Sequence, residues 1–389
     1  MRDIHRIRYD GAIDADGHIL EPPDLWERYL EPQYRDRALR ICRDGDGLEY
    51  LEIGGHASVL ARRGFPGTLG AMGKMHVEDV RPSPERTYLA GAPHGSMDMK
   101  ERLERLDAEN LDAAVLYPTI GILWEAELED AELSLAYCRA YNRWIADFCR
   151  DSRGRLVPIA HLSLGDPAGA ARELERAVRD GCRGAFVVPF TWSRLPHGHP
   201  EHDPVYAAAQ DLGVPIAIHP SFEPIAMAPT RFREPRKTRL LASVTAADGV
   251  RHAFTTFFDY GVFDRFPKLR VVVLESGAGW IGYWMDRIDA VYEATFIGER
   301  VPLAERPSHY FKTRCFISAD PDERTIPALA ERLGADRFFW ASDFPHADHT
   351  ANYMEEVEEL AGLLSPDARR RFLGDNAREL YQVGIQKPS

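Results

Sequence analysis

Positive charge is in short supply in this sequence. Its 48 lysines and arginines are outnumbered by 61 aspartates and glutamates, which gives a formal net charge of −13 at pH 7. Nucleic acids and anionic membrane surfaces attract proteins through a positive field, so both are poor candidates as partners. We expect a small-molecule substrate instead.

Long apolar runs and cysteine motifs are missing as well. No run of about 18 apolar residues occurs, and the charged start MRDIHRIRYDG precedes no apolar segment of a secretory signal. The five cysteines are odd in number and show no CxxC spacing, which is typical of reduced thiols in a cytosolic protein. We therefore predict a cytoplasmic protein that does not span a membrane.

What the sequence does contain is a regular series of short apolar, β-branched runs. Each run ends in polar turn residues and is followed by a helical pattern, which predicts parallel strands joined by crossover helices. There are eight: GAIDADGHI (11–19), LDAAVLYPT (111–119), LVPIAHLSL (156–164), GAFVVPF (184–190), PIAIHPS (215–221), RVVVLESG (270–277), RCFISAD (314–320) and RFFWASDFP (337–345).

Amphipathic segments alternate with these runs and predict helices at 97–110, 130–151, 167–180, 203–212, 242–258, 280–296, 323–333 and 353–364. Eight strands are the number that closes a TIM barrel, and 389 residues suffice for one barrel with insertions. We therefore predict an α/β fold, a (β/α)8 TIM barrel, in a single domain over residues 11–389.

Two stretches, 22–96 and 222–240, interrupt the alternation. Both follow the C-terminal end of a strand, the face where barrel enzymes build their sites, so we interpret them as lid or substrate loops. Ordinary surface insertions or oligomer arms are the alternative. The second stretch holds a basic cluster that suits either an anionic substrate or a solvated run of charge: Arg231, Arg233, Arg236, Lys237 and Arg239.

Metal-capable side chains gather where these strands end. They are Asp16, His18, His219, Glu275 and Asp343. Residues two apart on a strand point to the same face, so Asp16 and His18 both aim into the barrel mouth, with Asp14 one layer deeper as a support. Two imidazoles with carboxylates and no thiolate suit a divalent ion such as Zn, Mn or Fe.

The motifs DADGH with LEPPDLW, IHPS, LESGAGW and WASDFPH, in this order, resemble the amidohydrolase superfamily, in the branch of aminocarboxymuconate-semialdehyde decarboxylase. The resemblance implies a strand-1 ligand pair at Asp16 and His18, and further ligands at His219 and Asp343. It also implies that the protein forms a homo-oligomer. Many members have His or Glu where this chain has Asp16, and many have a strand-6 His where it has Glu275.

A divalent ion lowers the pKa of a bound water and polarises a carbonyl, while a carboxylate takes the proton. On this hypothesis Asp343 is the catalytic base, and Glu275 or His252 assists the leaving group. If a second ion is present, Glu275 is the candidate bridge and His252 a candidate ligand nearby. The expected cofactor is thus one divalent metal ion, or two.

Three further residues are candidates for substrate binding. Glu21 follows His18 at the exit of the first strand, where it would bind substrate, bind metal through water, or form a salt bridge. His161 lies on the third strand and His346 follows Asp343, where loop capping is the alternative role. The histidines of HGHPEH (197–202) are interpreted as exposed loop residues.

The sequence therefore predicts a metal-dependent hydrolase or decarboxylase that acts on a small organic acid, lactone or amide through a metal-activated water. The carboxylate-rich ligand set also suits nonheme iron. An alternative is accordingly a mono- or diiron O2-dependent monooxygenase that hydroxylates a larger natural-product or CoA-linked substrate.

Overall fold

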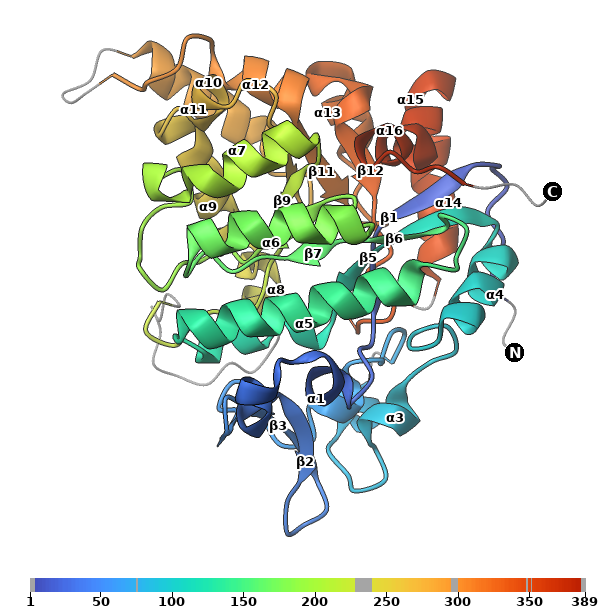
Figure 1. Ribbon diagram of the computed structural model, residues 1–389. Helices are drawn as coiled ribbons and strands as arrows, with labels where there is room; N and C mark the ends of the chain where they lie inside the picture. The colour runs from blue at the N-terminus through green and yellow to red at the C-terminus, as the bar shows by residue number, and fades with distance from the viewer. Residues whose placement is uncertain are drawn as a thin grey trace.

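The predicted strands all occur in the computed structural model, which describes residues 4–74, 76–227, 240–294, 300–347, 349–350 and 352–385 (Figure 1). The strands of the barrel are β1 (Ala12–Ile19), β5 (Leu111–Pro118), β6 (Leu156–Pro158), β7 (Ala160–His161), β8 (Ala185–Val187), β9 (Ile216–Ile218), β10 (Val271–Val273), β11 (Cys315–Ala319) and β12 (Phe338–Trp340). Every paired neighbour among them runs parallel.

The strand ladder has two interruptions. The third predicted strand is split at Ile159, so that β6 pairs with β5 while β7 pairs with β8. Between β12 and β1 the ladder is replaced by two backbone hydrogen bonds, from Asp343 N to Asp16 O (3.0 Å) and from His18 N to Phe344 O (2.8 Å). These bonds join the last strand to the first and complete the cyclic order of a TIM barrel.

The strands are buried on both faces, which is why their sequences read as continuous apolar runs. Around them lie the helices α4 (Met99–Glu109), α5 (Ala131–Cys149), α6 (Pro167–Asp180), α7 (Asp203–Leu212), α8 (Leu240–Thr245), α9 (Asp248–Asp259), α10 (Val262–Arg265), α11 (Ile281–Glu293), α12 (Pro307–Arg314), α13 (Ile326–Leu333), α14 (Tyr353–Gly362), α15 (Pro366–Arg370) and α16 (Asn376–Leu380). The single helix predicted over 242–258 is wrong, because the chain turns between α8 and α9.

The insertion at 22–96 has structure of its own. It contains a three-stranded antiparallel sheet, β2 (Arg40–Arg43), β3 (Glu49–Ile53) and β4 (His56–Ala57), with the short helices α1 (Leu25–Tyr29), α2 (Val77–Val80) and α3 (Tyr88–Gly91). Backbone hydrogen bonds from Met72 N to Pro345 O and from Gly73 N to His349 O tie it to the loop that follows β12. In the stretch 222–240, residues 228–239 with the basic cluster lie outside the described residues.

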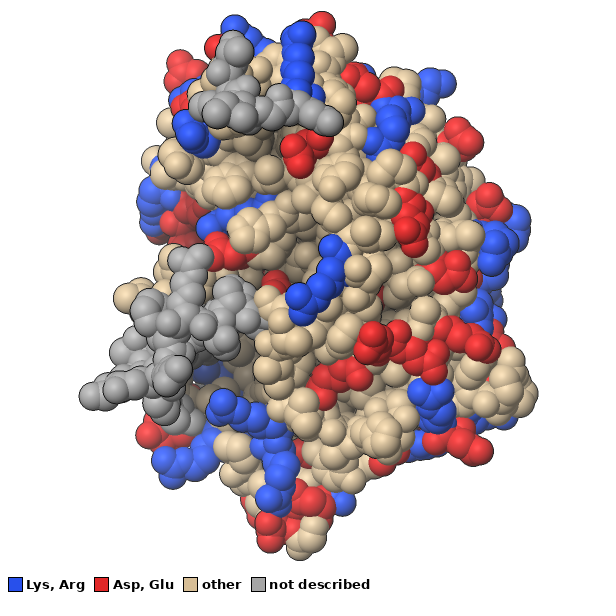
Figure 2. Space-filling model, turned by 90° about the vertical axis from the view of Figure 1, so that its left-hand side faces the viewer, with Lys and Arg blue, Asp and Glu red and all other residues tan. Residues whose placement is uncertain are grey.

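Acidic and basic side chains are interspersed on the face shown in Figure 2, which has no continuous basic expanse among its described residues. None of the described helices is both long and apolar enough to cross a membrane.

Candidate metal centre

The two histidines predicted as ligands face each other across the barrel mouth. The Nδ1 of His18 lies 2.8 Å from the carbonyl oxygen of Pro118, and the Nδ1 of His219 lies 2.7 Å from that of Pro220. A carbonyl oxygen only accepts, so each Nδ1 donates. The two Nε2 atoms are 3.3 Å apart. This is a spacing that two ligands adopt when each lies about 2.1 Å from one ion.

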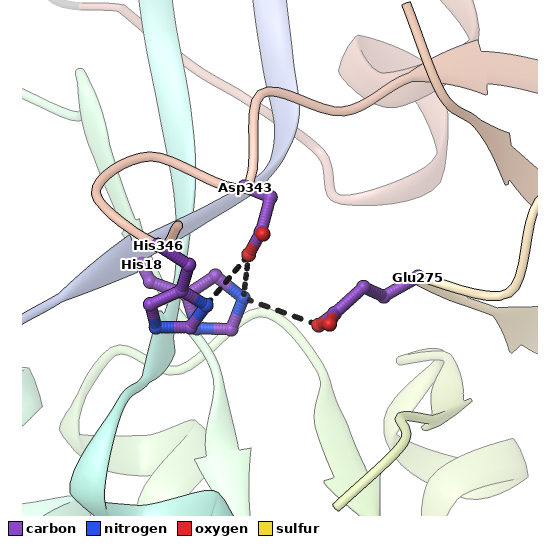
Figure 3. Close-up of side chains that lie close together, drawn as sticks. All are labelled: His18, Glu275, Asp343 and His346. Atoms are coloured by element: carbon purple, nitrogen blue, oxygen red, sulfur yellow. Dashed lines mark ion pairs between the residues drawn. The ribbon is translucent and has the colours of Figure 1, made fainter. Parts of the chain in front are cut away.

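Three carboxylates surround this pair, and Figure 3 shows two of them, Glu275 and Asp343, beside His18. Asp343 Oδ1 lies 3.3 Å from His18 Nε2, and Glu275 Oε2 lies 3.1 Å from His219 Nε2 and 3.9 Å from His18 Nε2. Asp16 Oδ1 is 3.8 Å from both imidazoles. The structure thus brings all five predicted ligands together, although they come from four strand ends.

Burial and mutual proximity shift the pKa values of these groups. Burial raises the pKa of Asp16 well above its ordinary value, and burial together with the neighbouring His346 and His219 lowers the pKa of His18 well below its own. Burial opposes protonation of His219, but the Glu275 carboxylate raises its pKa to about 9. For Glu275 itself, burial raises the pKa, and His219 reverses this and lowers it below the ordinary value.

Two of the carboxylates stand on unusual backbone. Glu275 has a φ of 41° and Asp343 a φ of 52°, which is the left-handed region that non-glycine residues rarely adopt. Such conformations cost about 1 to 3 kcal/mol each and concentrate at functional sites. They turn both side chains toward the histidines just as the strands end.

A divalent cation fits this donor set. Potential ligand atoms of His18, Glu275, Asp343 and His346 all lie within 4.8 Å of one another, as do those of Asp16, His18 and His219. Both carboxylate oxygens of Asp16 are buried and accept no hydrogen bond from the described residues. Uncompensated buried carboxylate oxygens are costly, and a bound cation would remove that cost. Imidazole nitrogens and carboxylate oxygens suit Zn, Mn or Fe.

Asp14 lies behind the donor set. Its carboxylate accepts hydrogen bonds from Ser342 N (3.0 Å) and Ser342 Oγ (2.6 Å), and the buried guanidinium of Arg102 is 3.9 Å away. Arg102 in turn donates to the carbonyl oxygen of His18 (3.1 Å). Asp14 therefore supports the two strand ends that carry Asp16, His18 and Asp343.

The structure does not bring His252 to the donor set. It lies on α9 with an exposed side chain and belongs to neither group of potential ligands. The helix buries a different stripe, formed by Val250, Ala253, Phe254, Phe257 and Phe258. Among the residues that the structure describes, no contact therefore supports its predicted catalytic role.

His346, predicted to bind substrate, lies directly beside two of the proposed metal ligands. Its Nδ1 lies 2.7 Å from Asp343 Oδ1, its Nε2 forms a 2.9 Å hydrogen bond with Thr119 Oγ1, and its ring packs against that of His18 with centroids 4.1 Å apart. Burial lowers the pKa of His346 to about 4. Both ring nitrogens are thus engaged by protein atoms.

Glu21 and His161 are also buried and bonded. The Glu21 carboxylate accepts backbone N–H groups from Thr119 (3.3 Å), Ile120 (2.9 Å) and Gly121 (2.8 Å), and burial raises its pKa to about 7. His161 Nε2 lies 2.9 Å from Glu125 Oε2. These contacts account for the Glu21 carboxylate and for Nε2 of His161, while Nδ1 of His161 has no hydrogen-bond partner among the described residues. Contact of either side chain with substrate stays a prediction.

The sequence reasoning missed Thr119 and Glu125. Thr119 ends the second predicted strand, so the search for polar strand ends could have found it had it included hydroxyls. Glu125, which also accepts from Ser163 Oγ (2.7 Å), lies in a short 3-10 turn with no preceding motif. The histidines of 197–202 were also misjudged, since His197 and His202 are buried and bonded within their own loop.

The chain is similar to several known proteins. The model of the amidohydrolase family matches residues 93–383. Gamma-resorcylate decarboxylase of Rhizobium radiobacter is 26% identical in an alignment over 321 residues that covers 76% of this chain and 91% of that protein.

Solved structures share the fold. An amidohydrolase from Mycobacterium avium subsp. paratuberculosis K-10 superposes with a TM-score of 0.79 at 24% identity, covering 96% of this chain and 99% of the other. A 5-carboxyvanillate decarboxylase from Novosphingobium aromaticivorans DSM 12444, complexed with manganese and a substituted nitrobenzoic acid, superposes with a TM-score of 0.69 at 20% identity, covering 98% and 99%.

Proposed function

Because the chain belongs to the amidohydrolase family, we propose that it is a metal-dependent enzyme that removes the carboxyl group from a small aromatic acid. Relatives named for the decarboxylation of gamma-resorcylate and of 5-carboxyvanillate support this substrate class. Hydrolysis of a lactone or amide is the second candidate, because the same donor set suits it. Two of these relatives are named as decarboxylases and the third as an amidohydrolase, so they give no support to the oxygenase alternative.

The observation that carries the proposal is the pair of His18 and His219. Their Nε2 atoms lie 3.3 Å apart with both Nδ1 atoms turned to carbonyl oxygens, and the buried oxygens of Asp16 lie beside them. We propose that Asp16, His18, His219 and Asp343 hold one Mn, Zn or Fe ion. Glu275 is the candidate for a further ligand or for the bridge to a second ion.

When bound, a divalent ion would polarise the oxygens of the substrate and neutralise its negative charge. Loss of CO2 breaks the bond between the ring carbon and the carboxylate and requires one proton at that carbon. Asp343 is the proposed carrier of this proton, and Glu275 is the second carboxyl within the donor set. In a hydrolysis, Asp343 would instead accept a proton from water.

His161 is the proposed contact on the substrate side. Phe186 stacks on the His161 ring, with centroids 4.4 Å apart, and also contacts the ring of His219 at 6.0 Å. The Nδ1 of His161 is buried and makes no hydrogen bond to the part of the chain that the structure describes. Phe186 therefore contacts both the His161 ring and the ring of His219, a proposed metal ligand.

We also propose that residues 11–389 form a single domain in which the insertion 22–96 serves as a lid. Leu51 and Tyr88 of the insertion belong to the same buried hydrophobic cluster as the barrel strands. Phe65 of the insertion contacts Phe222, which follows His219 closely in the chain, with ring centroids 5.6 Å apart.

We also propose that the protein is cytoplasmic and forms a homo-oligomer. The five cysteines are free, which fits a reducing compartment. Several large apolar side chains are exposed, among them Tyr283, Leu240 and Val244, and exposed apolar surface is a common feature of subunit interfaces. Light scattering coupled to size exclusion measures the number of subunits.

The test of the reaction is a substrate panel. The protein is stripped of metal, reloaded with Mn2+ or Zn2+, and mixed with hydroxybenzoic acids on one side and with aryl lactones and amides on the other. Release of CO2 from a hydroxybenzoic acid, abolished by a chelator, is the expected result. Turnover of lactones or amides alone would replace the decarboxylase by the hydrolase, and turnover of neither class would overturn the proposal.

A further inference from the structure

His346, Thr119 and Glu21 form a chain of contacts that ends on a proposed metal ligand. Glu21 follows β1, Thr119 follows β5, and His346 belongs to the loop after β12, so three strand ends meet in it. All three side chains are buried, with exposed fractions of 0%, 1% and 8% for Glu21, Thr119 and His346. Bulk water therefore has little access to these contacts.

The first contact fixes the backbone of Thr119. Three consecutive N–H groups, those of Thr119, Ile120 and Gly121, converge on the Glu21 carboxylate. Gly121 is required here because a Cβ on it would lie 2.5 Å from Pro118 Cβ and 3.3 Å from Glu21 Oε1. The turn is therefore held in one position relative to β1.

The second contact fixes the ring of His346. Thr119 Oγ1 lies 2.9 Å from His346 Nε2, and His346 Nδ1 lies 2.7 Å from Asp343 Oδ1. A ring nitrogen and a carboxylate oxygen this close require a proton or a cation between them. If the Thr119 hydroxyl donates to Nε2, the proton of a neutral ring sits on Nδ1 and points at Asp343.

We propose that Thr119 and His346 are positioning residues that hold the Asp343 carboxylate in the orientation needed to bind the metal ion, with Glu21 as their anchor. The proposal rests on the metal site of the proposed function. His346 acts through Asp343 and does not itself bind the ion, so that the ion has two histidine ligands, His18 and His219.

The first experiment measures Mn2+ affinity by calorimetry on the full-length protein. Loss of a contact behind a metal ligand typically weakens binding about 10- to 100-fold. We expect a loss of this size in Thr119→Val and in His346→Gln, and recovery to within about threefold of wild type in Thr119→Ser, which restores the hydroxyl. Thr191→Val is the matched control, because Thr191 is also buried but donates to Leu195 O.

Equal affinity in wild type and Thr119→Val, or failure of Thr119→Ser to recover it, would overturn the positioning role. A merely structural effect would appear equally in Thr191→Val. Absence of Mn2+ binding in wild type would instead be a failure of the proposed function. The two failures are thus distinguishable.

The second experiment counts the nitrogens bound to Mn2+ by electron spin-echo spectroscopy. We expect two strongly coupled histidine nitrogens in wild type and the same two in His346→Gln measured at saturating Mn2+. Three in wild type with loss of one in His346→Gln would show that His346 is a ligand, which contradicts the proposal.

Discussion

The Nε2 atoms of His18 and His219 lie 3.3 Å apart, and a backbone carbonyl holds the Nδ1 proton of each ring. Two imidazole lone pairs cannot face each other at this distance without a proton or a cation between them. The side chains come from β1 and from the end of β9, some 200 residues later. Their meeting is a product of the barrel, and it lies at the centre of the proposed metal site.

Gly17, between the proposed ligands Asp16 and His18, leads to a first prediction. A Cβ at this position would lie 2.5 Å from Asp14 Oδ2 and 2.8 Å from Arg102 Nη2. Gly17→Ala should therefore force apart the buried Asp14–Arg102 pair and lower the free energy of unfolding by about 2 to 4 kcal/mol. Urea denaturation measures the loss.

Gly45→Ala is the matched control, since a Cβ at Gly45 meets nothing within 4 Å. It should leave the free energy of unfolding within about 0.5 kcal/mol of wild type. Equal stability of the two variants would show that Asp14 and Arg102 do not depend on the missing side chain at residue 17.

A second prediction distinguishes the catalytic importance of Glu275 from that of His252. Glu275 lies 3.1 Å from His219, whereas His252 is exposed on α9. With the best substrate of the panel, Glu275→Gln should lower kcat/KM by at least about 100-fold, and His252→Ala should change it by less than about threefold. A large loss in His252→Ala with normal metal content would restore the catalytic role predicted from the sequence.

A third prediction concerns the pH dependence of stability and His197, which belongs to neither group of potential metal ligands. Burial lowers its pKa from 6.5 to about 4. Folding thus favours the neutral ring, so its contribution to stability is complete above pH 6.5 and is lost as the pH falls toward 4. Between pH 7.5 and pH 5 this loss amounts to about 2 kcal/mol.

His197→Gln keeps an N–H that can donate to Val188 O, as Nε2 of His197 does at 2.8 Å, but does not titrate. Between pH 7.5 and pH 5 the free energy of unfolding should therefore fall in both proteins, but the fall in His197→Gln should be about 2 kcal/mol smaller than in wild type. The exposed His56 serves as control, and His56→Gln should follow wild type. If the free energies of unfolding of wild type and His197→Gln changed in parallel with pH, the pH-dependent loss of stability could not be assigned to His197.

The barrel was predictable because its strands are short, apolar and followed by helical patterns. The polar residues at the strand ends were predictable for the same reason, since parallel strands bring their C-terminal ends to one face. Asp16 and Asp343 could thus be placed together although 327 positions separate them, and the backbone hydrogen bond between them closes the barrel.

Other features depend on contacts that no local pattern encodes. The chain turns between α8 and α9, and His252 is exposed because α9 buries a different stripe, which includes Phe254, Phe257 and Phe258. The 2.9 Å contact of Thr119 with His346 joins residues 227 positions apart, and neither residue type predicts the partner. Buried His197 was expected to be exposed because loop histidines usually are, whereas here Val188 O satisfies its ring.

The most direct test of the account is the metal content of the purified protein, measured by plasma mass spectrometry on wild type, His18→Ala, His219→Ala and His56→Ala. We predict about one equivalent of Mn, Zn or Fe per chain in wild type and in His56→Ala, and less than about 0.1 equivalent in the other two variants. Equal metal content in all four proteins, or full activity of wild type after complete removal of metal, would contradict the central claim that His18 and His219 hold a catalytic metal ion.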